Sequence, residues 1–201
     1  MNKIDKILKD VIDGKPIIIV DDEDREYEGD FMIAAEKATK KSLNFGLRYC
    51  RGLFCAPASG KTLDRLNIPM MVTNSTCKLG TPFTVSFDCI NGCTTGMSVF
   101  DKLKTVAVLV DDNSKAEELA RPGHVFGLRP KDNLLKDRRG HTEGSVEVCR
   151  LAKIKEVSVI IETMGNNGVM LKGSKLDSFA KTFGLNIVSI EEIYQAVYGK
   201  S

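Results

Sequence analysis

Ten consecutive residues near the N-terminus carry an unusual density of negative charge. The stretch Asp21–Asp30 reads D-D-E-D-R-E-Y-E-G-D and holds seven carboxylates and one arginine. Alternate carboxylates on an extended backbone, such as Glu26, Glu28 and Asp30, point to the same side. Close carboxylates repel one another when they lose water, so such a group needs solvent or a cation. The stretch therefore fits a divalent-metal or acid–base site, and on its own it also fits a solvated acidic loop.

The ligand types in this stretch favour a hard cation. Carboxylate oxygens suit Mg²⁺ or Mn²⁺ better than zinc. Arg25, inside the stretch, can form a bidentate pair with a carboxylate or a phosphate. The spacing also approaches that of a calcium EF-hand loop, but its last ligand position is Ala35 and an apolar strand precedes it. We reject that interpretation, and we also reject a P-loop at C-A-P-A-S-G-K-T because Cys55 stands at its first glycine.

A second reactive stretch, D-R-R-G-H-T-E-G, covers residues 137–144. Arg138, His141 and Thr142 stand where a helix is predicted to begin, with Thr142 or a neighbour as its N-cap. Free amides and the helix dipole attract anions there, so a phosphate monoester is a suitable ligand. His141 can offer a neutral nitrogen to a metal. The alternative is an ordinary capped helix with surface arginines.

Two further residues could transfer protons. His124 follows a Pro-Gly turn in A-R-P-G-H-V-F-G-L-R, and it fits either a general acid/base or a locally hydrogen-bonded side chain. Glu162 ends the apolar run V-S-V-I-I-E. Partial desolvation there would make its carboxylate a stronger base, and the alternative is a side chain that caps the next turn. Cys55 fits the core better than a site.

Hydrophobic patterning predicts the elements that must position these residues. Period-two or short β-branched runs predict strands at 17–20, 31–35, 52–56, 81–88, 124–128, 156–162 and 186–189. Helical spacing predicts helices at 4–12, 39–50, 94–110, 114–120, 142–153, 174–184 and 190–199. We therefore expect one α+β domain over residues 1–201, with a mixed sheet between helical layers.

Composition narrows the function classes. A net charge of +2 with both signs interspersed gives no reason to expect nucleic acid as a partner. No apolar run is long enough to span a bilayer, and the N-terminus has no signal-peptide core, so we expect a cytoplasmic protein with no membrane partner. The six cysteines form no C-x-x-C pair, and we expect reduced thiols.

Six motifs in order resemble one known family. They are D-D-E-D-R-E-Y-E-G-D, T-P-F-T-V-S-F-D, T-T-G-M-S-V-F-D-K, R-P-G-H-V-F-G-L-R, R-G-H-T-E-G-S-V-E-V-C-R-L-A and V-I-I-E-T-M-G-N-N-G-V-M. Together they resemble the 3,4-dihydroxy-2-butanone 4-phosphate synthases of riboflavin biosynthesis, over nearly the whole chain. The resemblance implies the monofunctional form, without an appended GTP cyclohydrolase II domain.

The resemblance implies a lyase reaction. D-Ribulose 5-phosphate would be converted into L-3,4-dihydroxy-2-butanone 4-phosphate and formate, with Mg²⁺ (or Mn²⁺) as cofactor. It also implies a three-layer α/β/α sandwich with a mixed, twisted central sheet, and a homodimer with active sites near the interface. The mechanism would begin with proton abstraction at C3, which gives an enediolate that a metal ion can stabilise.

The resemblance also assigns roles to residues. The metal ligands would be Glu26 and His141, with Glu28 near a second ion, and the catalytic residues would be His124 and Glu162. The substrate contacts would be Arg25, Glu26, Asp30, Arg138, Arg139, Gly140, His141, Thr142 and Glu162. The chain departs from the family pattern at Tyr27, Lys102, Gly127 and the Asn166–Asn167 turn, where Asn, Arg, Pro and an acidic pair are usual.

Two other function classes fit the same residues. One is a non-catalytic protein that binds anions and metals on the same scaffold, and it would show no turnover. The other is a phosphosugar isomerase or aldolase that uses the same enediolate chemistry. Release of formate would separate the synthase from the isomerase.

Overall fold

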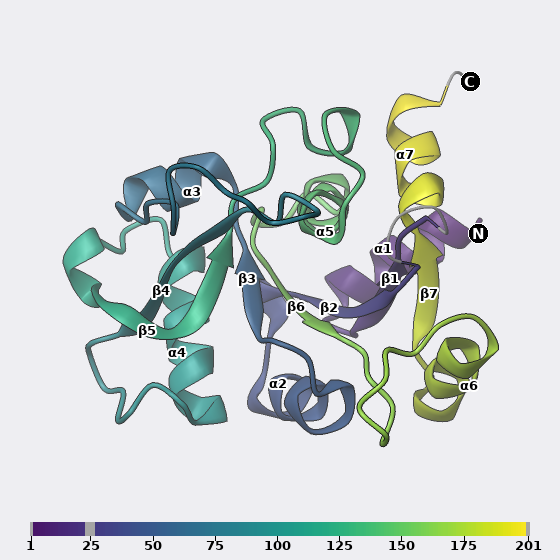
Figure 1. Ribbon diagram of the computed structural model, residues 1–201, viewed down its shortest axis with the longest axis horizontal. Coiled ribbons are helices and arrows are strands. Elements are labelled where there is room, and N and C mark those ends of the chain that lie inside the picture. The colour runs from purple at the N-terminus through teal and green to yellow at the C-terminus, as the bar shows by residue number, and fades with distance from the viewer. Residues whose placement is uncertain (1, 23–26, 200–201) are drawn as a thin grey trace.

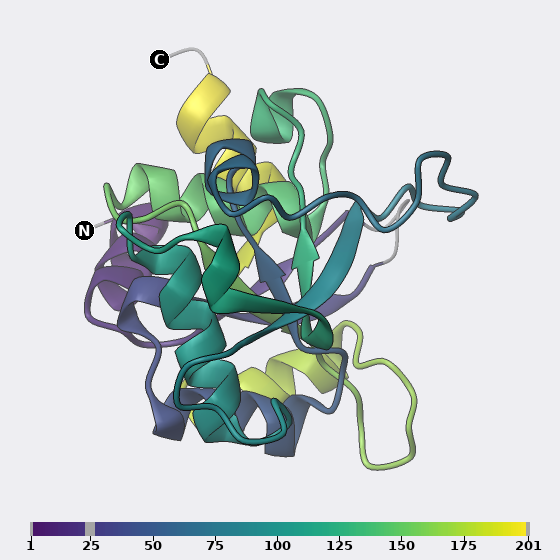
Figure 2. The ribbon, with the colours of Figure 1, turned by 90° about the vertical axis from the view of Figure 1, so that its left-hand side faces the viewer.

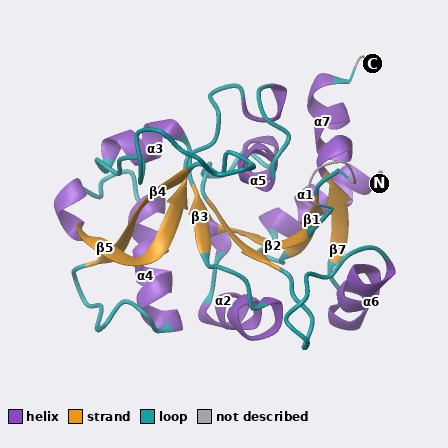
Figure 3. Cartoon of the chain, viewed as in Figure 1, coloured by secondary structure: helices purple, strands orange, loops and turns teal. Residues whose placement is uncertain are grey.

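Helices cover both faces of one seven-stranded sheet in the computed structural model, which describes residues 2–22 and 27–199 (Figures 1 and 3). The strands are β1 (Ile17–Val20), β2 (Gly29–Ala34), β3 (Cys55–Pro57), β4 (Phe83–Cys89), β5 (Leu119–Leu128), β6 (Ser158–Glu162) and β7 (Asn186–Ser189). Their order across the sheet is β4-β5-β3-β6-β2-β1-β7. The β1–β7 and β3–β5 pairs are parallel and the other four are antiparallel, which confirms the mixed sheet and the α+β class.

Alternation along the central strands divides the core into two layers. On β1, Ile18 packs into one buried cluster, while Ile17 and Ile19 pack into the other on the opposite face. On β2, Phe31 and Met32 separate in the same way. Both faces of these strands are buried, so β1 is apolar throughout and β2 is apolar from Phe31 to Ala34, as the short apolar runs predict.

The helices form the two outer layers (Figure 1). They are α1 (Lys3–Ile12), α2 (Lys40–Phe45), α3 (Gly60–Arg65), α4 (Val99–Val110), α5 (His141–Leu151), α6 (Ser174–Phe183) and α7 (Ile190–Tyr198). Helices α1, α5 and α7 lie on one face, and α2, α4 and α6 lie on the other. Helix α5 is buried from His141 to Cys149, so it forms the centre of its layer. The three-layer sandwich is confirmed.

Several predicted boundaries were wrong. Helix α3 was not predicted, although Ser59 caps it, because its one buried leucine, Leu63, makes no helical pattern by itself. The predicted helix at 39–50 changes after Phe45 into a π-helical turn over Gly46–Cys50. The segment at 114–120 forms one 3₁₀ turn and then enters β5, which begins five residues earlier than predicted because it pairs with β4.

The prediction of six reduced cysteines was also wrong. Cys89 and Cys93 form a disulfide across the turn that follows β4, with their Cα atoms 6.1 Å apart. A turn can bring two cysteines within bonding distance at a spacing of four, and the C-x-x-C criterion does not cover that spacing. The other four cysteines are free thiols. None of the helices in the described ranges is long and apolar enough to cross a membrane.

Two loops extend from the body. Figure 2 shows the segment between α3 and β4 extending away from the sheet, and the segment between β6 and α6 forming a second extended loop. The second loop contains the Asn166–Asn167 turn. There the Asn166 side-chain oxygen accepts a hydrogen bond from the Arg51 guanidinium at 2.7 Å, so the turn keeps a polar contact despite its departure from the family pattern.

Candidate active site

The two ends of the acidic stretch lie beside His141, where strand β1 ends and strand β2 begins. Strands β1 and β2 form an antiparallel pair whose last register position joins Val20 to Gly29. Beyond it, the Glu28 amide donates to Asp21 Oδ1 at 2.8 Å, and the Asp21 amide donates to the Glu28 carbonyl at 3.3 Å. These two bonds join Asp21 to Glu28 at the base of the loop, beside the first residue of α5.

His141 connects the two reactive stretches. Its Nε2 lies 3.3 Å from the Glu28 carbonyl oxygen and 3.8 Å from Asp21 Oδ1. Its Nδ1 lies 3.8 Å from Asp30 Oδ2. The imidazole, Asp21 and Asp30 are all buried. The structure therefore brings His141 beside Asp21, Glu28 and Asp30, more than a hundred residues away in the sequence, whereas its predicted pairing with Glu26 stays a prediction.

Asp30 and Glu162 form the second part of the site. They are direct partners on the antiparallel strands β2 and β6, so their side chains project from the same face of the sheet. Glu162 Oε2 accepts a hydrogen bond from the Leu53 amide at 2.7 Å. Gly52 lies so close that a Cβ there would come within 2.6 Å of the Glu162 backbone. A fixed carboxylate thus lies beside Asp30, which in turn lies beside His141.

Helix α5 presents its N-terminus to this group. The helix begins at His141 with Gly140 as N-cap, so the prediction of Thr142 as the cap was one or two residues late. Gly140 has no side chain to accept from the first amides, and no side-chain cap is formed. Those amides are left to bind an anion. Thr142 is buried in the first turn, and its hydroxyl belongs to the same end of the helix.

The two arginines before α5 have different partners. Arg138 donates to the buried Glu143 carboxylate at 2.6 Å and to the Leu79 carbonyl at 3.2 Å. Arg139 turns to α7, where it pairs with Glu191 and its guanidinium lies 3.9 Å from the centre of the Tyr194 ring. Arg138 is therefore the one beside the start of α5, and the prediction that Arg139 contacts substrate stays a prediction.

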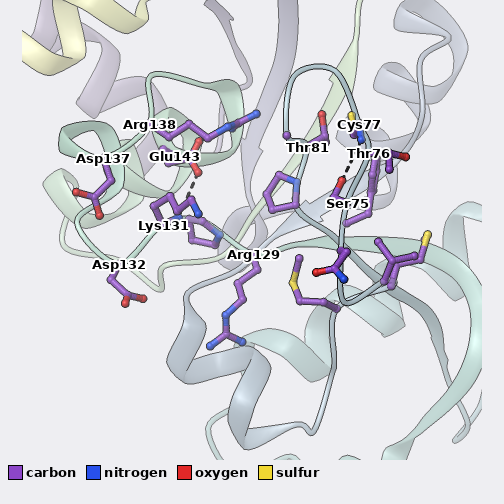
Figure 4. A pocket seen from close by; sticks show the side chains of 18 residues that line it. Ser75, Thr76, Cys77, Thr81, Arg129, Lys131, Asp132, Asp137, Arg138 and Glu143 are labelled. Atoms are coloured by element: carbon purple, nitrogen blue, oxygen red, sulfur yellow. Dashed lines mark hydrogen bonds and ion pairs between the residues drawn. The ribbon is translucent and has the colours of Figure 1, made fainter.

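A cavity of about 830 Å³ opens next to Arg138 (Figure 4). Arg138, Lys131 and Glu143 line one side, and the loop that carries Cys77 and Thr81 lines the other. The Lys131 amide donates to Glu143 at 3.2 Å, so Glu143 ties the segment between β5 and α5 to the helix. The cavity therefore reaches Arg138, just before α5, and Glu143 in its first turn.

His124 belongs to a separate polar group on β5. Its Nδ1 lies 2.6 Å from Asp88 Oδ2, and its carbonyl accepts a bond from Lys102 at 2.8 Å. Burial lowers the pKa of Lys102, and the nearby Asp88 carboxylate opposes that shift. Strand β5 lies two strands away from β6, so their backbones are about 10 Å apart. The structure does not bring His124 into contact with Glu162 within this chain.

Arg25 and Glu26 lie outside the residues that the structure describes. Within the described part, no three His, Cys, Asp or Glu side chains are grouped closely enough to hold a metal ion. The donor types around the loop base still fit a hard divalent cation, because His141 supplies an imidazole nitrogen and two buried carboxylates lie within 3.8 Å of it. Glu28 adds a carboxylate that lies 3.6 Å from Lys172.

The buried thiols near the site are not suited to nucleophilic chemistry. Burial raises the pKa of Cys55, and the charges of Glu162 and Asp30 add to the effect. Burial also raises the pKa of Cys50 to about 12, with a hydrogen bond from Thr163 opposing the shift. Protonated thiols are poor nucleophiles. Both cysteines therefore act as core residues, as expected for Cys55.

Sequence reasoning missed three polar residues near these groups. Asp21 was not separated from the other acids of its stretch, Lys172 lies in a loop without a motif, and Asp88 was treated only as the end of a strand. Only Asp88 carried a signal in the sequence. It is the last residue of an alternating strand, and a carboxylate at a half-buried strand end needs a polar partner. Tyr27, which replaces the usual Asn, has a positive φ of 52° and places its hydroxyl near Gly173.

Fold and site together define an α+β enzyme with polar groups at one end of its sheet. A family model described as 3,4-dihydroxy-2-butanone 4-phosphate synthase matches residues 5–196. The chain belongs to the 3,4-dihydroxy-2-butanone 4-phosphate synthase family.

Relatives differ in length. The chain is 41% identical to the riboflavin biosynthesis protein RibBA of Parabacteroides distasonis over 96% of this chain, and it spans only 48% of that protein. It is 41% identical to the 3,4-dihydroxy-2-butanone 4-phosphate synthase of Agrobacterium fabrum, over 98% of this chain and 93% of that one.

Solved structures of the family have the same fold. A 3,4-dihydroxy-2-butanone 4-phosphate synthase in complex with two magnesium ions superposes with a TM-score of 0.91, at 34% identity and with all of both chains covered. The synthase of Candida albicans gives a TM-score of 0.90, at 35% identity over 98% of each chain.

Proposed function

We propose that this protein converts D-ribulose 5-phosphate into L-3,4-dihydroxy-2-butanone 4-phosphate and formate, for riboflavin biosynthesis. The observation that carries the proposal is the Asp30–Glu162 pair beside His141 at the start of α5. It groups carboxylates, an imidazole and an anion-binding helix end in a chain of this family. Five carbons enter as one sugar phosphate, and they leave as a four-carbon phosphate and formate.

The phosphate of the substrate binds at the start of α5. The uncapped amides there and the helix dipole attract an anion. Arg138 enters from the side of the cavity, and Thr142 offers a hydroxyl in the same turn. Binding the phosphate away from the reacting carbons lets its binding energy orient the sugar at the carboxylates.

The cation of this reaction would be held by Glu26 and His141, with Glu28 near a second ion. The donor types favour Mg²⁺, with Mn²⁺ as an alternative. When bound, the cation supplies positive charge that stabilises the oxygens of an enediolate. The buried Asp21 and Asp30 carboxylates lie 3.8 Å from the two His141 ring nitrogens, one on each side.

Proton transfer falls to Glu162 and His124. Glu162 takes the proton from C3, because its carboxylate is held by the Leu53 amide and lies next to Asp30. Asp30 contacts a hydroxyl of the sugar. His124 serves a later proton transfer, since loss of the C1 hydroxyl and release of formate each move a proton at a defined atom.

The test is incubation of the protein with ribulose 5-phosphate and Mg²⁺, followed by assays for formate and a four-carbon phosphate. Equal amounts of both are expected. Xylulose 5-phosphate or ribose 5-phosphate without formate would indicate an isomerase instead. No consumption of substrate would favour a protein that only binds anions and metals.

A variant pair makes this test specific to the site. Glu162→Gln keeps an oxygen to accept from the Leu53 amide but removes the base, so formate production should fall by about 10²-fold or more. Glu156→Gln, just before the same strand, is the matched control and should retain normal turnover. Near-normal turnover in Glu162→Gln would exclude Glu162 as the base.

We also propose that two copies of the chain assemble as a homodimer that covers the region beside His124. Three large apolar side chains are exposed there, on the turn after β4 and at the start of α4: Ile90, Met97 and Phe100. Such a concentration suits an interface. Light scattering should report a dimer for the natural protein and a monomer for Phe100→Glu, whereas Val169→Glu, on the loop between β6 and α6, should remain dimeric. A monomeric natural protein would overturn this assignment.

A further inference from the structure

Strand β5 contains a bulge that carries His124 out of the sheet ladder. The register of β4 and β5 passes from Phe87–Val125 directly to Asp88–Ala120, so residues 121–124 have no partner in the ladder. Backbone amides that leave a ladder need other acceptors. Bulges of this kind occur next to active sites, where they change the direction of a side chain.

Side chains of β4 bind the bulged amides. The Gly123 amide donates to Ser86 Oγ at 3.1 Å, and the His124 amide donates to Asp88 Oδ1 at 2.9 Å. Pro122, directly before them, has no N–H to satisfy. The bulge is therefore held by two polar side chains of the neighbouring strand.

Asp88 also holds the ring of His124. Its second oxygen, Oδ2, lies 2.6 Å from Nδ1. One carboxylate thus binds both the backbone and the imidazole of the same residue. The Asp88 side chain is only 12% exposed, whereas the His124 side chain is 46% exposed. Within the described part of the chain, Nδ1 is the ring nitrogen with a hydrogen-bond partner, and Nε2 is the one available to a ligand.

Helix α4 and the segment before it pack around the Asp88–His124 pair. Lys102, buried in α4, donates to the His124 carbonyl and lies 5.1 Å from the Phe54 ring centre. Gly96 approaches from the other side, and a Cβ there would overlap the Asp88 carboxylate. Asp101 accepts from the Gly96 amide at 3.1 Å and keeps that segment in place. The charged groups around the pair are thus Lys102 and Asp101, both from α4.

We propose that Asp88 is a positioning residue that keeps the proton of neutral His124 on Nδ1, so that Nε2 is the atom that exchanges protons with substrate. A carboxylate can only accept, so the ring must donate from Nδ1. The second nitrogen of a neutral imidazole is then an acceptor in a fixed direction. The role of His124 Nε2 in turnover rests on the proposed function. The tautomer of His124 does not, because it is a property of the free protein.

The decisive measurement is ¹⁵N NMR of the histidine rings in the free protein at about pH 8.5, two units above the usual imidazole value. The chain has two histidines, so a His124→Gln spectrum assigns the signals. In the natural protein, we expect His124 with Nδ1 protonated. In Asp88→Asn, the amide can donate to Nδ1, so the proton should move to Nε2. Ser86→Ala is the matched control, because it removes the other bulge acceptor and should leave the tautomer unchanged.

Kinetics then separate positioning from structure. Asp88→Asn should lower kcat by about 10²-fold or more with KM changed less than about threefold, and Ser86→Ala should retain most of kcat. An unchanged tautomer in Asp88→Asn, or a changed tautomer with undiminished kcat, would overturn the inference. Absence of formate from the natural protein would overturn the proposed function alone, because the NMR comparison needs no substrate.

Discussion

Asp30 and Glu162 face each other across β2 and β6, and Asp30 also lies 3.8 Å from the His141 ring. The Asp30 carboxylate thus lies between the His141 imidazole at the start of α5 and Glu162 at the end of β6. The antiparallel register explains the pairing, because opposite residues project from the same face. The three side chains come from three elements that are distant in sequence.

Gly52 should be needed for the position of Glu162. Gly52→Ala would place a Cβ within 2.6 Å of the Glu162 backbone, which cannot move without disturbing β6. We expect a loss of about 1–3 kcal/mol in the free energy of unfolding. We also expect at least a tenfold loss of formate production, because the carboxylate shifts with its backbone. Urea unfolding and the formate assay measure the two effects.

The control for Gly52 lies at the start of α3. A Cβ on Gly60 would meet the flexible end of the Arg129 side chain at 3.1 Å, which can move aside. Gly60→Ala should therefore retain both stability and turnover. Normal turnover in Gly52→Ala would show that Glu162 is not held by this contact.

Metal binding should depend on one histidine and not on the other. We expect Glu26→Ala and His141→Ala each to abolish Mg²⁺-dependent turnover without unfolding the protein, and to weaken Mg²⁺ affinity at least tenfold. His124→Ala is the matched control, because His124 lies on β5 with Asp88 and should leave Mg²⁺ affinity unchanged. Calorimetric titration with Mg²⁺ and circular dichroism provide the measurements. Retained Mg²⁺ affinity in His141→Ala would exclude the metal assignment.

The two adjacent arginines should behave differently. Arg138→Ala removes the cation beside the start of α5, so KM for ribulose 5-phosphate should rise about tenfold or more. Arg139→Ala removes a half-exposed ion pair and a ring contact on α7, so Tm should fall by about 2–4 °C with KM within twofold. Steady-state kinetics and thermal unfolding compare the variants. A large rise of KM in Arg139→Ala would instead support the sequence prediction that Arg139 contacts substrate.

Acid should weaken the segment that holds Gly96. The Thr94 amide, followed by the Thr94 hydroxyl, Ser98 and the Gly96 amide, lowers the pKa of Asp101 to about 2. Because the folded-state pKa lies below the usual 3.8, ionised Asp101 stabilises the fold above about pH 4. That contribution is lost as the pH falls toward 2. Asp101→Asn should therefore be less stable than the natural protein at pH 7.

The pH dependence distinguishes this cause from a packing effect. The stability difference between Asp101→Asn and the natural protein should shrink between about pH 4 and pH 2. Thr94→Val lacks the hydroxyl that donates to Asp101 at 2.8 Å. Its stability difference from the natural protein should be smaller than that of Asp101→Asn over the same pH range. Denaturant unfolding at several pH values measures both. A difference that stays constant down to pH 2 would indicate that charge is not involved.

Local patterns in the sequence were enough for most of the fold. Alternation predicted β4, short β-branched runs predicted β1 and β7, and helical spacing predicted α1, α5 and α7. These elements are specified by residues within one segment, so no distant contact is needed to recognise them. The acidic stretch and the start of α5 were identified as reactive for the same reason, since their residue types and spacing are local.

Contacts between distant segments were not predictable in this way. The Asp88–His124 pair depends on a bulge in β5, and the Asp30–Glu162 pair depends on the register of β2 with β6. The resemblance grouped Arg139 with Arg138 as a substrate contact, which stays a prediction, and in this structure α7 supplies its partner Glu191. Strand order and register arise from packing of the whole domain, where a shift of one residue reverses the face of every side chain. Residue types thus indicated which chemistry was possible, and long-range pairing selected the side chains that can perform it together.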